Sequence, residues 1–176
     1  MTVIKDILKE NKRLYRISTV ISDLSKEIKV PAFLVGGCVR DLLLEPEKHS
    51  ADIDIMVEGD GIAFAHQLAR ELNVATVAPF PKFATARIPY KECEIEVASA
   101  RLESYDPESR KPKDIIMTDI NEDLQRRDFT VNAMAISLQK NNMGTLIDPF
   151  DGFKDLNAKI LRTPMTNSDV TFSDDP

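Results

Sequence analysis

The chain has 176 residues and a net charge of −6, and its apolar and charged fractions are ordinary for a globular protein. This length allows one domain with a hydrophobic core, and the acidic balance excludes the broadly basic surface of a self-sufficient nucleic-acid binder. Two cysteines, Cys38 and Cys93, are too few for a disulfide framework and lack metal-ligand spacing. With neither a signal peptide nor a membrane span at the N-terminus, we expect a cytoplasmic protein.

The first part of the chain predicts a long helix at 4–28, where apolar residues recur at helical spacing until Pro31. The two glycines Gly36 and Gly37 then interrupt a short apolar run, and a turn follows at 58–61. The expected elements in this part are a strand at 32–35, a helix at 38–44, a strand at 52–57 and a helix at 62–72.

The second part predicts closely spaced strands, a long loop and one more helix. The expected strands lie at 74–78, 83–88 and 92–98, with a turn at 89–91, and the charged, proline-containing stretch 101–114 has the composition of an exposed, mobile loop. A helix is expected to begin near Asn121 or Glu122 and to cover 123–127. Beyond it lie apolar runs at 131–138, 145–147 and 159–161, a turn at 148–152 and a short helical piece.

The interleaved strands and helices indicate an α/β (α+β) fold. Strand pairs close in sequence near Pro89 and near 141–144 indicate antiparallel pairing. We therefore predict a mixed, mostly antiparallel sheet flanked by helices rather than a doubly wound parallel sheet.

Asp52 and Asp54 alternate with apolar residues, so a strand places both carboxylates on one face, about 7 Å apart. The strand at 92–98 presents Glu94 and Glu96 in the same way. If the two strands are neighbours, the crowded carboxylates favour a bound cation, and one of the glutamates completes an oxygen-rich magnesium site. Alternation does not choose between Glu94 and Glu96, and a solvated strand end is the alternative.

The turn at Gly36 and Gly37 begins a helix, which places backbone N–H groups where a phosphate binds. It is neither the dinucleotide-binding fingerprint nor a Walker A loop. Arg40 and Asp41 favour phosphate binding, because arginine binds phosphate through two N–H groups and the aspartate can orient it. The alternatives are that the glycines only allow a tight backbone turn and that Arg40 and Asp41 form an ordinary surface ion pair.

The polar run at 122–133 contains a second set of candidates. Arg126 and Arg127 are expected to grip a triphosphate, while Asp123, Asp128 and Asn132 are expected to bond to a sugar or base. A solvated helix with ion pairs between residues four apart is an equally good interpretation.

These motifs occur together and in a fixed order, with a further turn near the end of the chain. They are Leu34-Val-Gly-Gly-Cys-Val-Arg-Asp41, Asp52-Ile-Asp54, Glu96-Val-Ala-Ser-Ala-Arg101, Arg126-Arg-Asp-Phe-Thr-Val-Asn-Ala133 and Asp148-Pro-Phe-Asp-Gly152. In order and spacing they resemble the bacterial CCA-adding tRNA nucleotidyltransferases and poly(A) polymerases, from about Phe33 to the last residue. The stretch 100–112 resembles the version in CCA-adding enzymes that carry a later HD domain.

The resemblance implies a head domain of the polymerase-β-like nucleotidyltransferase superfamily. By that resemblance Asp52, Asp54 and Glu96 hold two Mg²⁺ ions, which selects Glu96 over Glu94. It also implies that Gly37, Arg40 and Arg127 contact the incoming nucleotide. Together with their neighbours in the two other motifs, the candidate nucleotide-binding residues are Gly36, Gly37, Arg40, Arg126, Arg127, Asp128 and Asn132. One departure is Ala84, which stands before Thr85 where many relatives have glycine.

The implied reaction is the addition of CMP and AMP from CTP and ATP to the 3′ end of tRNA. A poly(A) polymerase and a non-catalytic nucleotide-binding module are the alternatives. The expected divisions are an N-terminal helical segment at 1–31, the catalytic head at 32–163 and the start of a truncated neck at 164–176. Because the resemblance places base-reading and tRNA-binding parts beyond this point, the chain by itself is expected to be weakly active or inactive.

Overall fold

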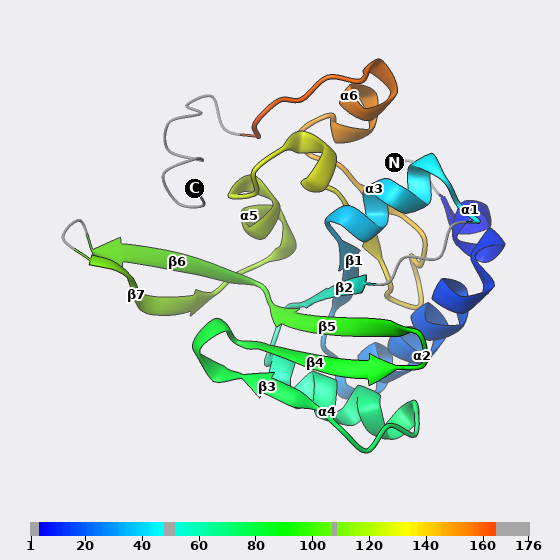
Figure 1. Cartoon of the computed structure of the whole chain (residues 1–176), viewed down its shortest axis with the longest axis vertical. Helices are drawn as coiled ribbons and strands as arrows, with labels where there is room; N and C mark the ends of the chain where they lie inside the picture. The colour runs from blue at the N-terminus through cyan, green and yellow to red at the C-terminus, as the bar shows by residue number, and fades with distance from the viewer. Residues whose placement is uncertain (1–3, 48–51, 107–108, 165–176) are drawn as a thin grey trace.

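A seven-stranded mixed sheet forms the centre of the molecule (Figure 1). The computed structural model describes residues 4–47, 52–106 and 109–164, and between 101 and 117 it describes the backbone alone. The strands of the sheet are β1 (Ala32–Val35), β2 (Asp52–Val57), β3 (Ala78–Phe80), β4 (Thr85–Tyr90), β5 (Cys93–Ser99), β8 (Ala135–Ser137) and β9 (Leu146–Ile147). Their order is β3-β4-β5-β2-β1-β8-β9, with β2 and β5 parallel and the other pairs antiparallel. The predicted fold class is confirmed.

Helices cover both faces of this sheet. The α-helices are α1 (Lys5–Glu10), α2 (Lys12–Ile28), α3 (Gly37–Leu44), α4 (Gly61–Glu71), α5 (Ile120–Gln125) and α6 (Gly152–Ala158). The main core packs α1, α2 and α4 against one face, and α4 lies along β3, β4 and β5 in Figure 1. A smaller core packs Ile120 and Leu124 of α5 against the other face. The carboxylates of interest belong to this second face.

Alternation along β2 places its side chains as the sequence predicted. Ile53 and Ile55 are almost fully buried in the main core, whereas Asp52 is exposed and Asp54 is half-buried on the opposite face. The same alternation along β5 buries Ile95 and Val97. Strand formation therefore follows from burial of one apolar face, which leaves the other face free to carry charge.

The single helix expected at 4–28 is wrong, because the chain breaks at Asn11 into α1 and α2. The Asn11 side chain accepts a hydrogen bond from the backbone N–H of Leu14 at 3.1 Å and so caps α2. Asparagine competes well for backbone groups at such a position, and this overrides the apolar periodicity.

Two of the strands expected after α4 begin later than predicted. Residues 74–77 form no strand, and Val74 and Val77 pack on the core instead. The first strand after α4 is β3. Phe83 belongs to the 3-10 helix η1 (Pro81–Phe83), so β4 starts at Thr85. Pro89 lies inside β4 rather than in a turn. Proline has no backbone N–H to donate, and none is needed on this side of β4, because the pairing with β3 ends at Arg87.

The mobile loop expected at 101–114 is also wrong. The backbone forms the antiparallel hairpin β6 (Arg101–Asp106) and β7 (Ser109–Met117), which extends away from the sheet in Figure 1. Charged and prolyl residues obscured the strand pattern, and the pairing is irregular at Tyr105. The hairpin begins immediately after β5, which carries Glu96.

The helix expected at 123–127 is α5, which ends at Gln125 and leaves Arg126 and Arg127 just beyond its last turn. The apolar run at 131–138 divides into the 3-10 helix η2 (Thr130–Asn132) and β8. No element forms at 159–161. Of the expected neck segment 164–176, all but Pro164 lies outside the described residues. Among the helices that the structure describes, none is long and apolar enough to cross a membrane.

Candidate active site

The four predicted carboxylates lie on two neighbouring strands. In the parallel pairing of β2 with β5, Asp52 is opposite Glu94 and Asp54 is opposite Glu96. The condition set by the sequence, that the two strands be neighbours, is thus met. Like charges directly opposite each other are unfavourable in a sheet, so this face has an excess of negative charge to be balanced.

Arg87 of β4 supplies part of that balance. Its Nε donates to Glu96 Oε2 at 2.7 Å, and its Nη1 lies 3.3 Å from Glu94 Oε1. The hydrogen bond to Glu96 raises the pKa of Arg87. This arginine was not among the residues that the sequence indicated.

Asp54 is half-buried among charged side chains of both signs. Its burial raises its pKa above the ordinary value, and the neighbouring carboxylates of Glu96 and Asp52 raise it further. Arg127 and Arg87 act in the opposite direction. Asp54 therefore lies among charges of both signs, and a cation beside it would relieve the repulsion.

Gly36 brings the first strand into contact with this cluster. Its φ of +71° is one that glycine adopts readily. A Cβ atom placed there would lie 3.0 Å from Arg127 Nη1 and 3.6 Å from Asp54 Oδ2. The close approach of Arg127 to the carboxylate face thus depends on the absence of a side chain at position 36.

Arg127 is held in place by Asp123, which is fully buried. Asp123 Oδ2 accepts from Arg127 Nη2 at 3.1 Å, and Oδ1 accepts from Arg126 Nη2 at 2.5 Å. The expectation that Asp123 bonds to a sugar or base is therefore wrong in this structure, because its carboxylate is turned into the protein to orient two arginines. The fork of charge-assisted bonds fixes the direction in which Arg127 points.

A second arginine is positioned in a similar way on α3. Arg40 Nε donates to Asp41 Oδ1 at 2.9 Å, and Arg40 Nη1 donates to Asn132 Oδ1 at 2.8 Å. Asn132 in turn donates to Asp128. A Cβ atom on Gly37 would lie 3.5 Å from Arg40 Nη2, so this guanidinium lies beside the glycine turn. The structure thereby joins the motifs of α3 and η2, which are far apart in the sequence.

The donor chemistry of the carboxylate face fits magnesium, which prefers oxygen ligands. In the described part of the chain, however, no three side chains of the His, Cys, Asp and Glu types are gathered tightly enough to hold a metal ion. Glu96 is engaged with Arg87 instead. A metal held by Asp52, Asp54 and Glu96 would therefore share Glu96 with Arg87 or compete with Arg87 for it.

Cys38 lies directly beneath this face but takes no part in it. The thiol is buried and donates to the backbone oxygen of Val35 at 3.1 Å. Burial, with the nearby Asp54 charge, raises the pKa of Cys38 to about 12. A neutral thiol here serves packing rather than nucleophilic chemistry.

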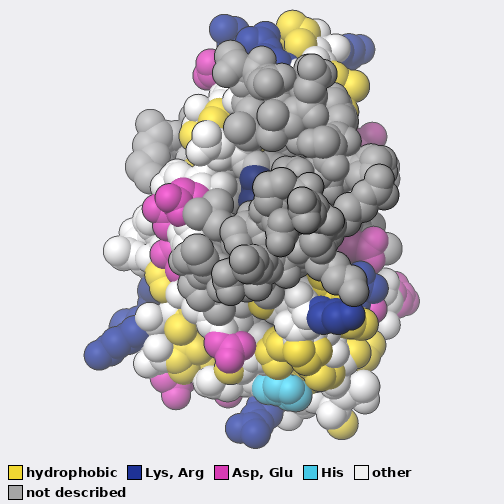
Figure 2. All heavy atoms as spheres, turned by 90° about the vertical axis from the view of Figure 1, so that its left-hand side faces the viewer, with side chains coloured by type: hydrophobic (Ala, Val, Ile, Leu, Met, Phe, Trp, Pro, Cys, Tyr) yellow, Lys and Arg dark blue, Asp and Glu magenta, His cyan; other side chains and the backbone are white. Residues whose placement is uncertain are grey.

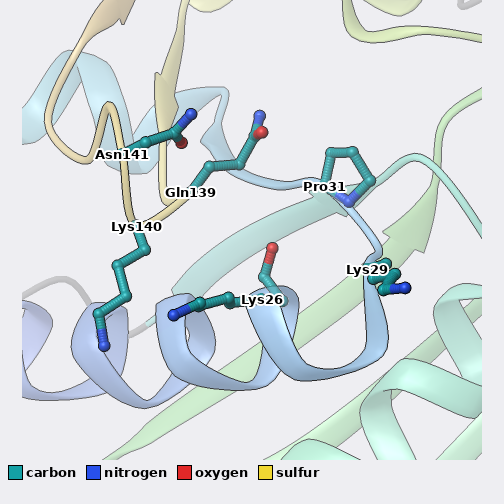
Figure 3. Close-up of a pocket in the computed structure, with 7 residues that line it drawn as sticks. Lys26, Lys29, Pro31, Gln139, Lys140 and Asn141 are labelled. Carbon is teal, nitrogen blue, oxygen red and sulfur yellow. The ribbon is translucent and has the colours of Figure 1, made fainter.

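A cavity of about 540 Å³ lies at another place, between the end of α2 and the turn after β8 (Figure 3). Lys26, Gln139 and Asn141 are among the residues that line it. Lys140, on the same turn, pairs with Asp23 of α2 at 2.8 Å. The lining contains none of the carboxylates or arginines described above, so this cavity is separate from the candidate site.

The predicted residues come together from β2, β5, the glycine turn before α3 and the segment after α5. The structure brings Asp52, Asp54, Glu96, Gly36 and Arg127 to one face of the sheet. Arg126 shares Asp123 with Arg127 and is directed to that buried carboxylate rather than to the face of the sheet. The structure adds two features that the sequence did not indicate. Arg87 binds Glu96, and Asp123 orients Arg127.

The chain is similar to known proteins over most of its length. The chain matches the family described as the Poly A polymerase head domain over residues 32–162. It is 45% identical over 145 residues to an A-adding tRNA nucleotidyltransferase of Aquifex aeolicus, over 82% of this chain and 17% of that protein. It is also similar to the solved structure of a CCA-adding enzyme in apo form II, with a TM-score of 0.84, 38% identity and coverage of 100% of this chain and 41% of that chain.

A further similar structure is that of a tRNA nucleotidyltransferase complexed with a primer tRNA and an incoming ATP analog. Here the TM-score is 0.73 and the identity 42%, over 89% of this chain and 41% of that chain. The chain therefore spans less than half the length of these relatives. The match over residues 32–162 shows that the chain belongs to the family of poly(A) polymerase head domains.

Proposed function

We propose that this chain is the catalytic head of a template-independent nucleotidyltransferase that adds nucleotides from CTP or ATP to the 3′ end of tRNA in the cytoplasm. In this proposal the head spans 32–163, the segment 1–31 packs on it, and 164–176 begins a neck. Relatives described as A-adding and CCA-adding enzymes support the choice of tRNA.

One observation carries the proposal. Asp54 and Glu96 lie opposite each other on neighbouring strands, and Arg127, just after α5, reaches the same place across Gly36. Carboxylates that can hold divalent ions, next to an arginine that can hold phosphate, are what transfer of a nucleotidyl group requires.

In the proposed reaction the oxygen of the primer 3′-hydroxyl bonds to the α-phosphorus of the nucleotide. The bond from that phosphorus to the β-phosphate oxygen breaks, and pyrophosphate leaves. Two Mg²⁺ ions, when bound by Asp52, Asp54 and Glu96, supply the Lewis acidity that activates the hydroxyl and stabilises the leaving group.

The side chains of this head then bind and orient. Arg127, directed by Asp123, is placed to bind phosphate oxygens next to the carboxylates, and Arg40 is placed to do so at the glycine turn. Asn132 is held between Arg40 and Asp128, where its amide positions Arg40 beside the glycine turn. Fixed donors of this kind stabilise developing charge without reorganising during the reaction.

Addition of A alone is a second candidate, because the relative that is 45% identical is described as an A-adding enzyme. A poly(A) polymerase is a third candidate, which the family description supports. A non-catalytic nucleotide-binding module is a fourth. The carboxylates and arginines are common to the first three, so the choice between those three depends on base selection.

The experiment that tests the proposal supplies labelled CTP and ATP, singly and together, to the full-length protein with three RNAs. These are a tRNA lacking its last three nucleotides, a tRNA lacking only the terminal A, and an unrelated RNA. Addition of two C and one A supports CCA addition, and a single A on the second RNA alone supports an A-adding enzyme. Open-ended A addition to every RNA moves the assignment to poly(A) polymerase, and magnesium-dependent nucleotide binding without incorporation supports the non-catalytic module.

Asp52→Asn links any incorporation to this site. Loss of the charge should lower the rate of incorporation by about 10²–10³-fold, the scale observed when a group that stabilises transition-state charge is removed. Glu92→Gln is the matched control, since this exposed acidic residue lies in the turn between β4 and β5 and outside the cluster. Equal activity of the two variants would refute the proposed site.

A further inference from the structure

Two phenylalanines are exposed next to the carboxylate face. Phe80 is 40% exposed and Phe83 is 57% exposed, whereas most large apolar side chains of the described residues are buried. Figure 2 shows hydrophobic side chains gathered in the lower half of the face on which the β3–β4 connection lies in Figure 1. The two rings line a cleft of about 370 Å³ whose other lining residues are Thr85, Arg87 and Glu96. One wall of this cleft is thus a proposed metal ligand.

The exposure of these rings comes from an ordered turn. Phe80 pairs with Thr85 across β3 and β4, and Ala84 closes the turn with its N–H bonded to the Pro81 carbonyl at 3.1 Å. The Ala84 carbonyl accepts from the backbone N–H of Ser99 at 3.1 Å, which ties the turn to the end of β5. Arg87 packs over the Phe80 ring with 5.5 Å to its centroid. The rings are therefore held at the surface before any ligand arrives.

The strand order places this cleft on one side of the carboxylates and the nucleotide-binding residues on the other. β1, with the glycine turn that follows it, lies next to β2, whereas β4 lies next to β5. Arg127 and Arg40 approach from the β1 side, and Phe80 and Phe83 approach from the β4 side. A hydroxyl that attacks the α-phosphorus opposite the leaving pyrophosphate must come from the side away from the triphosphate.

We infer that the cleft between Phe83 and Glu96 receives the terminal nucleoside of the RNA primer, whose base stacks on the phenylalanine rings. This inference rests on the proposed function. Aromatic rings bind bases of single-stranded RNA through stacking, with little dependence on sequence, and an adjacent arginine adds a cation–π contribution. Tolerance of sequence is what a primer end that changes after each addition requires. Glu96 in the same cleft places the 3′-hydroxyl of a stacked nucleoside near the reaction centre.

The test uses the full-length protein with four variants and measures KM separately for the primer tRNA and for ATP. Phe83→Ala should raise the primer KM about tenfold and leave the ATP KM unchanged, because stacking on the ring is lost. Phe83→Leu should behave like Phe83→Ala, and Phe83→Tyr should behave like the unchanged protein, since the ring is what binds. Leu44→Ala is the matched control, because Leu44 is also 57% exposed but does not line the cleft.

A second readout does not depend on activity. A primer tRNA with 2-aminopurine as its last base should lose fluorescence on binding to the unchanged protein and much less on binding to Phe83→Ala. If incorporation proceeds but neither the primer KM nor the quenching depends on Phe83, the primer cleft is refuted while the proposed function stands. A rise in the ATP KM alone would assign the rings to the incoming nucleotide and overturn the inference. Quenching that depends on Phe83 in a protein that incorporates nothing would keep the cleft and refute the proposed function.

Discussion

Arg87 and Glu96 face each other across the β4–β5 pair, with Arg87 Nε 2.7 Å from Glu96 Oε2. This ion pair occupies the carboxylate that we propose as a metal ligand. In the absence of metal, Arg87 therefore offsets part of the negative charge of the cluster, and it competes with a metal for Glu96.

Arg87→Ala should tighten the binding of Mn²⁺, used as a probe in place of Mg²⁺. Without the arginine, Glu94 and Glu96 lose their cation, and because exposed ion pairs are weak, the Kd for Mn²⁺ should fall by at most about fivefold. Titration of Mn²⁺ followed by electron paramagnetic resonance, without nucleotide, measures this. Lys91→Ala removes an exposed cation from the nearby turn and should leave the Kd unchanged. A weaker Mn²⁺ affinity of Arg87→Ala would contradict the competition.

Asp54 should make the metal-free protein less stable as the pH rises. Its pKa is raised in the folded protein, from an ordinary value of 3.8, by burial and by Glu96. The folded state therefore binds more protons than the unfolded state in this range, and the stability that Asp54 contributes is present below its unfolded pKa and lost as the pH rises through its folded pKa.

Asp54→Asn should remove that loss and increase the free energy of unfolding at neutral pH by about 0.5 kcal/mol, since a like charge opposite Glu96 disappears. Urea unfolding with a chelator present, repeated across the acid-to-neutral range, gives the comparison. A variant that is less stable than the unchanged protein at neutral pH would show that repulsion does not dominate at Asp54.

Arg127→Ala should raise the Kd for both ATP and CTP about tenfold, because a charge-assisted hydrogen bond contributes roughly 1.5–3 kcal/mol. Arg126→Ala is the matched control: both arginines bond to Asp123, but Arg127 is the one that reaches Gly36 and Asp54. We expect less than about a threefold change for Arg126→Ala. Nucleotide titration calorimetry distinguishes the two, and equal effects would mean that the pair acts only through net charge.

Ala84→Gly should stabilise the fold. Ala84 has a φ of +48°, a left-handed conformation that costs an alanine about 1–2 kcal/mol, although glycine gives back part of this through its freer unfolded chain. A net gain of about 0.5–1 kcal/mol in the free energy of unfolding is expected from urea unfolding. Ala63→Gly on the exposed face of α4 should instead destabilise, because it has ordinary helical geometry.

The carboxylate strands were predictable because their pattern is local. A period of two alone sends Asp52 and Asp54 to one face, and Glu94 and Glu96 to one face, whatever the rest of the chain does. Pairing of the two strands depends on contacts between residues far apart in the sequence. From the sequence alone, their position as neighbours could therefore only be assumed, and the structure shows that they are neighbours.

Arg87 was missed because the turn was expected two residues too early. Pro89 suggested a turn at 89–91, whereas the strands turn at Lys91 and Glu92, with Tyr90 paired to Cys93 and Lys91 at a φ of +54°. With the turn in its actual place, the register sets Arg87 opposite Glu96 without further information. The hairpin at 101–117 was missed for another reason, since backbone pairing needs no apolar alternation when a strand extends away from the core.

Ala100 anchors the β6–β7 hairpin to the sheet. This fully buried residue separates β5 from β6, its N–H bonds to the Val57 carbonyl at 2.8 Å, and its carbonyl accepts from Thr118 at 3.0 Å. Both ends of the hairpin are thereby clamped to the end of the strand pair that carries the carboxylates. A force that bends the β6–β7 hairpin will therefore be transmitted to β5, because Ala100 is the only residue between β5 and β6 and is itself hydrogen-bonded in place.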